Sequence, residues 1–210
     1  MKPRWTHQRN QALTLVEVIV IVAVLMFLGV CLLSVLSAAH KQSKEINCVN
    51  NLHEIGAAHR RWEVDGNRHS SLQISASDQD VWVLWQSMSN WLRTPKILVC
   101  PADRKRAVAA SFATGFGNAN ISYFLNGAAK TDPQTVLDGD ANLTVDGVPV
   151  QPGVLNVWTN NRVGWTKERN HGGGGWGNIG MADGSVGTTT PDSVNSAFAA
   201  SPITNRLAIP

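Results

Sequence analysis

The chain has little charge and no basic surface beyond its first residues. Charged residues make up only 16% of its 210 residues, against 43% hydrophobic ones, which excludes a disordered polyelectrolyte. The formal net charge of +3 is supplied by Lys2, Arg4 and Arg9, which precede the first acidic residue. We therefore expect no nucleic-acid partner, because a protein that follows phosphates needs a basic face.

Signatures of catalysis and of structural zinc are also missing. The sequence has no C-x-x-C pair and no paired histidine spacing that would favour zinc. The glycine run at 172–175 lacks the G-x-x-x-x-G-K-[ST] pattern of a phosphate loop. His171 and Asp183 have no nucleophile motif beside them, which disfavours an extracytoplasmic hydrolase. We expect a protein that is not an enzyme and, calcium apart, has no cofactor.

A single long apolar run occupies residues 13–36, LTLVEVIVIVAVLMFLGVCLLSVL, and its only charge is Glu17. A membrane-spanning helix needs about 20 such residues, or roughly 30 Å of helix. Basic residues precede the run and acidic ones do not, so we expect a single-pass protein with a cytoplasmic N-terminus and an extracytoplasmic body from about residue 40. The absence of a second run excludes a multi-span transporter.

Three simpler interpretations of this run compete. A cleaved signal peptide would use the small residues at 37–39, but its apolar core is usually about 7–15 residues long. A buried helix of a soluble protein is usually shorter as well. A plain signal anchor explains length and orientation but not Glu17, because a carboxylate in lipid costs roughly 2.5–3.5 kcal/mol and needs a partner.

The residues around Glu17 resemble a known processing motif. Ala12 to Val18, A-L-T-L-V-E-V, is similar to the prepilin-type cleavage and methylation motif of type IV pilins and type II secretion pseudopilins, usually G-F-T-L-I-E. The resemblance implies that a prepilin peptidase/methyltransferase cuts between Ala12 and Leu13 and methylates Leu13. It also implies that Glu17 pairs with the N-terminal amine of a neighbouring pilin-like subunit in the bacterial inner membrane. The sequence departs from the pattern at Ala12, in place of Gly, and at Leu13, in place of Phe.

A second resemblance lies further along the chain. C-V-N-N-L-H-E-I-G, at 48–56, is similar to C-x-N-N-L-K-Q-I-G in a pseudopilin-like subfamily with a C-terminal His, a Gly-rich stretch and Asp-Gly. Here these residues are His171, Asp183 and Gly184, with eleven residues between the first two where the family usually has nine. We expect them to be structural, a wide turn closed by an Asp183-Gly184 hairpin with His171 hydrogen-bonded nearby.

The body is expected to combine the end of a long helix with a small sheet. Apolar residues recur every three or four positions up to Gly66-Asn67, which predicts an amphipathic stalk helix. Short apolar alternations predict strands at 121–125, 143–145, 154–158 and 179–182. Turns are expected at Asp138-Gly139, Asp146-Gly147 and Asp183-Gly184.

The fold class is therefore α+β, a long N-terminal membrane-spanning and stalk helix packed on a small antiparallel head. The resemblance makes this arrangement pilin-like. The expected segments are a basic leader at 1–12, a transmembrane helix at 13–36, a stalk helix at 37–65 and a head at 66–210.

The three cysteines are expected to serve packing and cross-linking. Cys31 lies in the apolar run and should pack as a small hydrophobe. Cys48 and Cys100 lie in the extracytoplasmic body, where an oxidising compartment favours a disulfide. It would close a loop of about 50 residues and contribute roughly 3–4 kcal/mol. Two buried thiols are the alternative.

One segment leaves a calcium site open. Asp138, Asp140, Asn142 and Asp146, with Thr144 between the last two, place oxygen side chains at alternate positions, as calcium loops do. The glycine and the bidentate glutamate of an EF-hand loop are absent, so a solvated hairpin rich in turn formers is the simpler interpretation.

The cluster of Trp82, Trp85 and Trp91 favours a hydrophobic core, although stacked sugars would also suit it. The alternative to a pseudopilin-like subunit is therefore a single-pass anchored extracytoplasmic module that binds a glycan or calcium.

Overall fold

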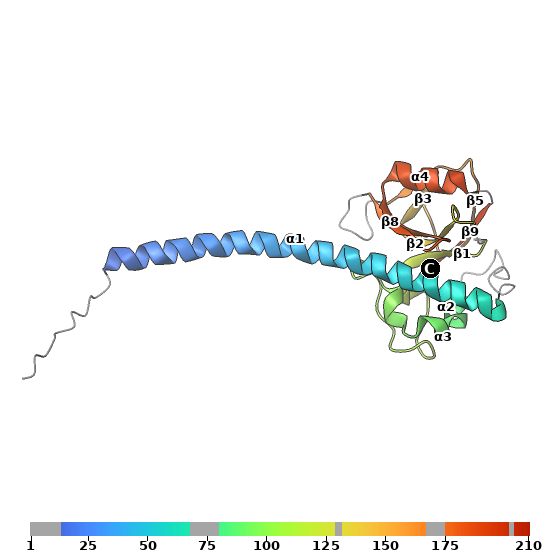
Figure 1. Cartoon of the computed structure of the whole chain (residues 1–210), viewed down its shortest axis with the longest axis horizontal. Helices are drawn as coiled ribbons and strands as arrows, with labels where there is room; N and C mark the ends of the chain where they lie inside the picture. Colours follow the sequence, from blue (N-terminus) through green and yellow to red (C-terminus); the bar gives the residue numbers. More distant parts are fainter. Residues whose placement is uncertain (1–13, 68–79, 129–131, 167–174, 202–203) are drawn as a thin grey trace, which may run out of the picture. The chain divides into compact units, whose positions relative to one another are not determined.

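The computed structural model describes residues 14–67, 80–128, 132–166, 175–201 and 204–210 (Figure 1). The chain forms two compact units, Met1–His40 and Lys41–Pro210, called here unit 1 and unit 2.

Helix α1 spans Leu15–Trp62 and contributes to both units. In unit 1 its large apolar side chains are exposed at nearly every position, from 45% at Val18 to 78% at Leu15. A helix that is apolar all round needs a nonpolar environment. By length and composition α1 is able to cross a membrane, which confirms the prediction of one long apolar helix near the N-terminus.

In unit 2 the same helix is amphipathic. Its buried positions recur at steps of three or four: Cys48, Leu52, Ile55, Ala58 and Trp62. A π-helical turn, Glu63–Asn67, follows α1 at the predicted Gly66-Asn67 stop.

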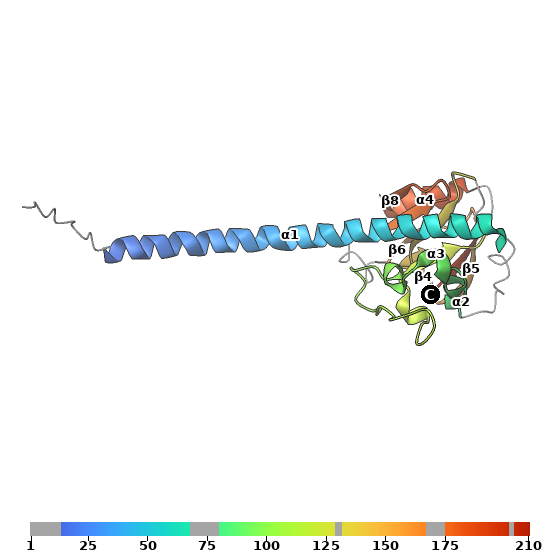
Figure 2. The same ribbon diagram turned by 60° about the horizontal axis from the view of Figure 1, so that its bottom comes forward.

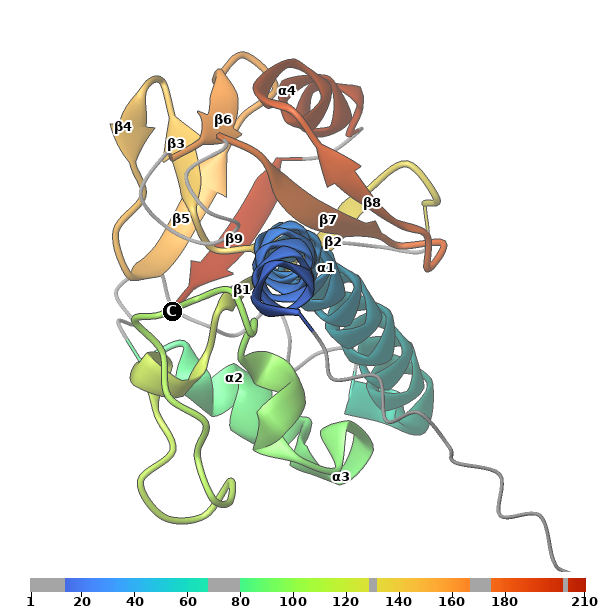
Figure 3. The same cartoon turned by 90° about the vertical axis from the view of Figure 1, so that its left-hand side faces the viewer.

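The described part of unit 2 contains two antiparallel sheets (Figure 3). The larger has the order β5-β9-β1-β2-β7-β8. Its strands are β1 (Tyr123–Asn126), β2 (Val136–Asp140), β5 (Gly153–Val157), β7 (Gly177–Met181), β8 (Val186–Thr189) and β9 (Asn205–Ile209). The smaller has the order β4-β3-β6, built from β3 (Leu143–Val145), β4 (Val148–Pro149) and β6 (Val163–Trp165). Strand β9 pairs with both β5 and β1, although it comes after all of the other described strands in the sequence.

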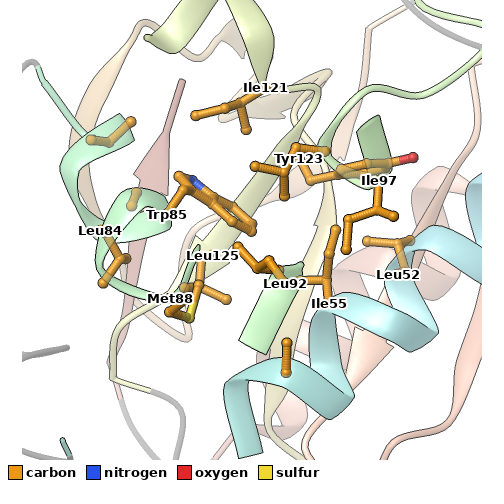
Figure 4. Packing of buried hydrophobic residues seen from close by; sticks show 14 of the residues in the cluster. Leu52, Ile55, Leu84, Trp85, Met88, Leu92, Ile97, Ile121, Tyr123 and Leu125 are labelled. Atoms are coloured by element: carbon orange, nitrogen blue, oxygen red, sulfur yellow. The ribbon is translucent and has the colours of Figure 1, made fainter. Parts of the chain in front are cut away.

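One face of the larger sheet packs against α1 and two short helices, α2 (Trp82–Ser87) and α3 (Ser89–Leu92). Figure 4 shows Ile55 of α1, Leu92 of α3 and Leu125 of β1 meeting in this core, with Trp85 of α2 beside them. Short 3₁₀ turns at Pro95–Leu98 and Asn118–Asn120 complete this side.

The other face of the larger sheet packs against α4 (Pro191–Ala200) and the smaller sheet. Phe124 of β1, Trp165 of β6 and Phe198 of α4 share this second core. Figure 1 and Figure 2 both place α4 on the side of unit 2 opposite α2 and α3. Unit 2 therefore has three layers, and the predicted α+β class with an antiparallel sheet packed on the long helix is confirmed.

The tryptophan cluster is mainly part of the core, as the simpler interpretation predicts. Trp85 is fully buried, and Trp82 and Trp91 are half-buried against the same cluster. Trp82 also meets Phe116 edge to face, with ring centroids 6.3 Å apart.

The strand predictions agree with β1, β3, β5 and β7 to within a few residues. Turns are present at Asp146-Gly147 and Asp183-Gly184. The predicted turn at Asp138-Gly139 is wrong, because both residues lie within β2 and pair with β1. Strand pairing and burial override the local preference of an Asp-Gly dipeptide for turns.

Candidate functional site

Thr14 and Glu17, from the segment that resembles the prepilin-type motif, lie at the start of α1. Glu17 Oε2 accepts hydrogen bonds from Thr14 N and Thr14 Oγ1, each at 2.8 Å, and Glu17 N donates to Thr14 Oγ1 at 3.3 Å. These bonds make a capping box, in which T-x-x-E satisfies the first backbone donors of a helix. Ala12 and Leu13 lie outside the described residues. T-L-V-E therefore has a structural use within one chain, which the sequence analysis missed.

The second resemblance motif is described at its Asp-Gly end, whereas His171 lies outside the described residues. Asp183 and Gly184 form the tight β7–β8 turn, where Gly184 has a φ of +93°. Ser185 donates from Oγ and N to Asp183 Oδ1, at 2.7 and 2.8 Å, and these bonds lower the pKa of the exposed Asp183. The Arg60 guanidinium of α1 packs on the turn, since a Cβ at Gly184 would lie 2.8 Å from Nη2.

A disulfide joins Cys48 of α1 to Cys100, with their Cα atoms 5.2 Å apart. Both cysteines are fully buried. Beside the disulfide, Asn51 Nδ2 donates to Val99 O at 3.3 Å and to Tyr123 Oη at 3.2 Å. The disulfide and Asn51 together attach the C-terminal part of α1 to the segment before β1 and to β1 itself.

Two fully buried carboxylates, Asp138 and Asp140, lie on β2. Asn178 of β7 donates to Asp140 Oδ2 from N at 2.7 Å and from Nδ2 at 3.2 Å. Asp138 instead faces α1. A Cβ at Gly56 would lie 3.6 Å from Asp138 Oδ2 and 3.5 Å from Arg60 Nη1, so the carboxyl and the guanidinium both border this glycine.

Burial controls the protonation of this layer. It raises the pKa of Asp138 to about 8, against a lowering by Arg60 and with a smaller rise from Asp140. Burial also lowers the pKa of His59 to about 4, and the positive charge of Arg60 lowers it further. Near pH 7 Asp138 is therefore mostly protonated and His59 is neutral, so the guanidinium of Arg60 lies beside an uncharged acid.

The predicted calcium ligands are divided between two environments. Asp138, Asp140 and Asn142 are buried, so the solvated-hairpin interpretation is wrong for them. Asp146 is exposed at the β3–β4 turn. Its carboxylate accepts hydrogen bonds of 2.8 Å from Asn161 Nδ2 and from Arg162 N. Within the part of the chain that the structure describes, no three His, Cys, Asp or Glu side chains are grouped to hold a metal ion. Calcium binding here stays a prediction.

Replacing Gly180 by alanine tests how tightly Asp138 is enclosed. A Cβ at Gly180 would overlap Asp138 Oδ1 within a filled layer. We expect Gly180→Ala to lower the free energy of unfolding by about 2–3 kcal/mol, as overpacking does. Gly187→Ala on the adjacent strand is the matched control, because nothing lies within 4 Å of its Cβ position, and a change below about 0.5 kcal/mol is expected. If urea unfolding showed the same decrease in the free energy of unfolding for both variants, close packing of Asp138 against Gly180 would be contradicted.

Comparison of the chain with protein-family models, curated proteins and solved structures gives no match.

Proposed function

We propose that the chain is a pseudopilin-like structural subunit of a type II secretion or type IV pilus-like assembly, processed by a prepilin peptidase and without catalytic activity. The observation that carries the proposal is Glu17, an ionisable residue in the first turn of a helix whose large side chains up to Leu36 are apolar and exposed. Such a helix suits the inner membrane, with the head outside the cytoplasm. A carboxylate at its start then needs a cationic partner.

The capping box supplies hydrogen bonds to Glu17 but no opposite charge, because both Thr14 donors are neutral. Cleavage after Ala12 gives Leu13 a new α-amine, one residue before the cap. In lipid an uncompensated carboxylate is costly, so pairing Glu17 with the amine of a neighbouring subunit favours association and sets the register between subunits.

The N-terminus of the protein extracted from native membranes tests processing directly. We expect intact-mass and peptide mass spectrometry to show a chain that begins with methylated Leu13. A chain that begins at Met1 would support the static anchored module instead. A start near Ala39 or His40 would identify an ordinary signal peptide and remove Glu17 from the mature protein.

Glu17→Gln separates the two uses of Glu17. Glutamine keeps an acceptor oxygen for Thr14 and suits a capping box, but it has no charge. We expect E17Q to reduce copurification of differently tagged subunits about 10-fold or more, since each 1.4 kcal/mol of lost pairing is a factor of ten. Thr14→Ala removes the side-chain cap and keeps the charge, so assembly should change by less than about 2-fold.

Glu54→Gln is the matched control, because it removes one exposed acid from the part of α1 in unit 2. It should copurify like the unmodified chain. Mass spectrometry of each variant shows whether it was cleaved, so a processing defect is not counted as an assembly defect. Normal association of E17Q, together with poor association of T14A, would show that Glu17 acts only as a cap.

A further inference from the structure

An open groove of about 520 Å³ lies where α1 ends. It is formed by the last turns of α1, the π-helical turn that follows and α3. Its lining residues are Ala57, Arg60, Arg61, Val64, Asp65 and Trp91. All of them belong to unit 2, and neither the capping box nor the apolar part of α1 contributes.

One wall of the groove is a fixed aromatic ring beside a carboxylate. Trp91 Nε1 donates a hydrogen bond of 2.7 Å to Asp65 Oδ2. Trp91 is half-buried and packs against the core, so its indole is held on one side by the fold and on its edge by Asp65. A ring held in this way offers a flat apolar surface at little cost in side-chain entropy. The carboxylate keeps capacity to accept further hydrogen bonds.

Two arginines of α1 also line the groove. Arg61 is exposed, whereas Arg60 is half-buried and reaches toward Asp138 and the β7–β8 turn. Arg60 Nη1 is buried and has no hydrogen-bond partner within the described residues. A nitrogen that is shielded from solvent is not accessible to a ligand in an open groove. The charge available to an anion in the groove is therefore that of the exposed Arg61, and a guanidinium group matches a carboxylate with two parallel bonds.

We propose that this groove binds a uronic-acid saccharide. The apolar face of the sugar ring would lie on Trp91, its carboxylate would meet the exposed Arg61, and a hydroxyl group would donate to Asp65. An acidic peptide also carries carboxylates, but it would set them near Asp65 without hydroxyl groups to pair with it. A neutral sugar would leave the guanidinium of Arg61 without an anion. The uronic acid is the class that uses all three parts of the groove.

The proposal is tested with trigalacturonate and the full-length protein in detergent micelles, by isothermal titration calorimetry. We expect measurable binding, and at least a 10-fold weaker affinity for the fully methyl-esterified trisaccharide, which has the same rings without the charge. Arg61→Glu should weaken binding of trigalacturonate at least 10-fold. Arg104→Glu makes the same change of net charge at an exposed position that does not line the groove, so it should change affinity less than 2-fold.

A further variant separates stacking from charge. Trp91→Leu should weaken trigalacturonate and its methyl ester by a similar factor, because it removes a surface that both use. Its circular dichroism spectrum and unfolding midpoint show whether it is folded, and Arg61→Glu keeps the test informative if it is not.

The proposal is overturned if trigalacturonate does not bind at millimolar concentration, if the ester binds equally well, or if Arg104→Glu has the effect of Arg61→Glu. Tighter binding of triglutamate than of trigalacturonate would assign the groove to acidic peptides. None of these outcomes depends on assembly or on cleavage at Leu13.

Discussion

Reduction of the Cys48–Cys100 disulfide is expected to lower the free energy of unfolding by about 4 kcal/mol. The sequence separation of the two cysteines is 52 residues, and the chain-entropy model assigns this value to a loop of that length. The bond links α1 to the segment before β1. Without it the unfolded chain has a higher conformational entropy, whereas the folded chain keeps the same conformation. For a domain with an ordinary stability of about 5–15 kcal/mol, this is a large share.

Urea unfolding with and without a phosphine reductant measures the effect, with tryptophan fluorescence as the signal. The double variant Cys48→Ala/Cys100→Ala should be destabilised in oxidising buffer and should not respond to the reductant. Cys31→Ser, a change in unit 1, should respond as the unmodified chain does. A reductant effect below about 1 kcal/mol, or an equal effect on the double variant, would contradict a stabilising role for this disulfide.

Raising the pH from 6.5 to 8 is expected to lower the free energy of unfolding by about 1–2 kcal/mol through Asp138. The folded-state pKa of Asp138, about 8, is above its ordinary value of 3.8, so the folded chain holds this proton more tightly than the unfolded chain. This contribution is fully present below pH 3.8 and is lost as the pH rises through 8. The groups that act on Asp138 are Arg60 from α1, Asp140 from β2 and the backbone of Gly180 from β7.

His59 has the opposite sign and defines the pH window. Its folded-state pKa of about 4 lies below the ordinary 6.5, so its contribution is present above pH 6.5 and is lost as the pH falls toward 4. Its neighbours include Arg60 and Glu63, whose Oε2 lies 3.9 Å from His59 Nδ1. Between pH 4 and 6.5 the effects of His59 and Asp138 oppose each other. Above pH 6.5 the unfolded-state histidine loses its remaining protons, which raises the free energy of unfolding by less than about 0.5 kcal/mol, so Asp138 dominates the fall.

Asp138→Asn isolates the effect, because asparagine has nearly the shape of a protonated aspartic acid. Urea unfolding of this variant should show no fall between pH 6.5 and 8, and at pH 8 the variant should be more stable than the unmodified chain. Glu54→Gln, which removes an exposed acid, should keep the fall. A stability profile of the unmodified chain that does not fall over this interval would contradict a protonated Asp138 in the folded state.

Periodicity in the sequence was sufficient to predict the long helix and the short strands, because both depend on local patterns of apolar residues. It failed at Asp138-Gly139, where pairing on both sides of β2 determines the structure. It also missed Arg60. An arginine near the end of a helix is expected in solvent, and only the fold brings it over Gly184 and beside Asp138. The groove was missed for the same reason, since Arg61 of α1 and Trp91 of α3 are distant in sequence and only the fold brings them to one groove.

The position of β9 has a consequence for the order of folding. Residues 205–209 form an inner strand of the larger sheet, between β5 and β1, so that sheet remains split until the ribosome has synthesised them. Ala208 contacts the core shared with α1, and Leu207 and Ile209 contact the core shared with α4, so neither core is complete earlier. Contacts between segments so distant along the chain form slowly, and apolar surface stays exposed to solvent until they have formed. A nascent chain stalled before residue 205 should therefore be a client for holding chaperones and a preferred target of proteases.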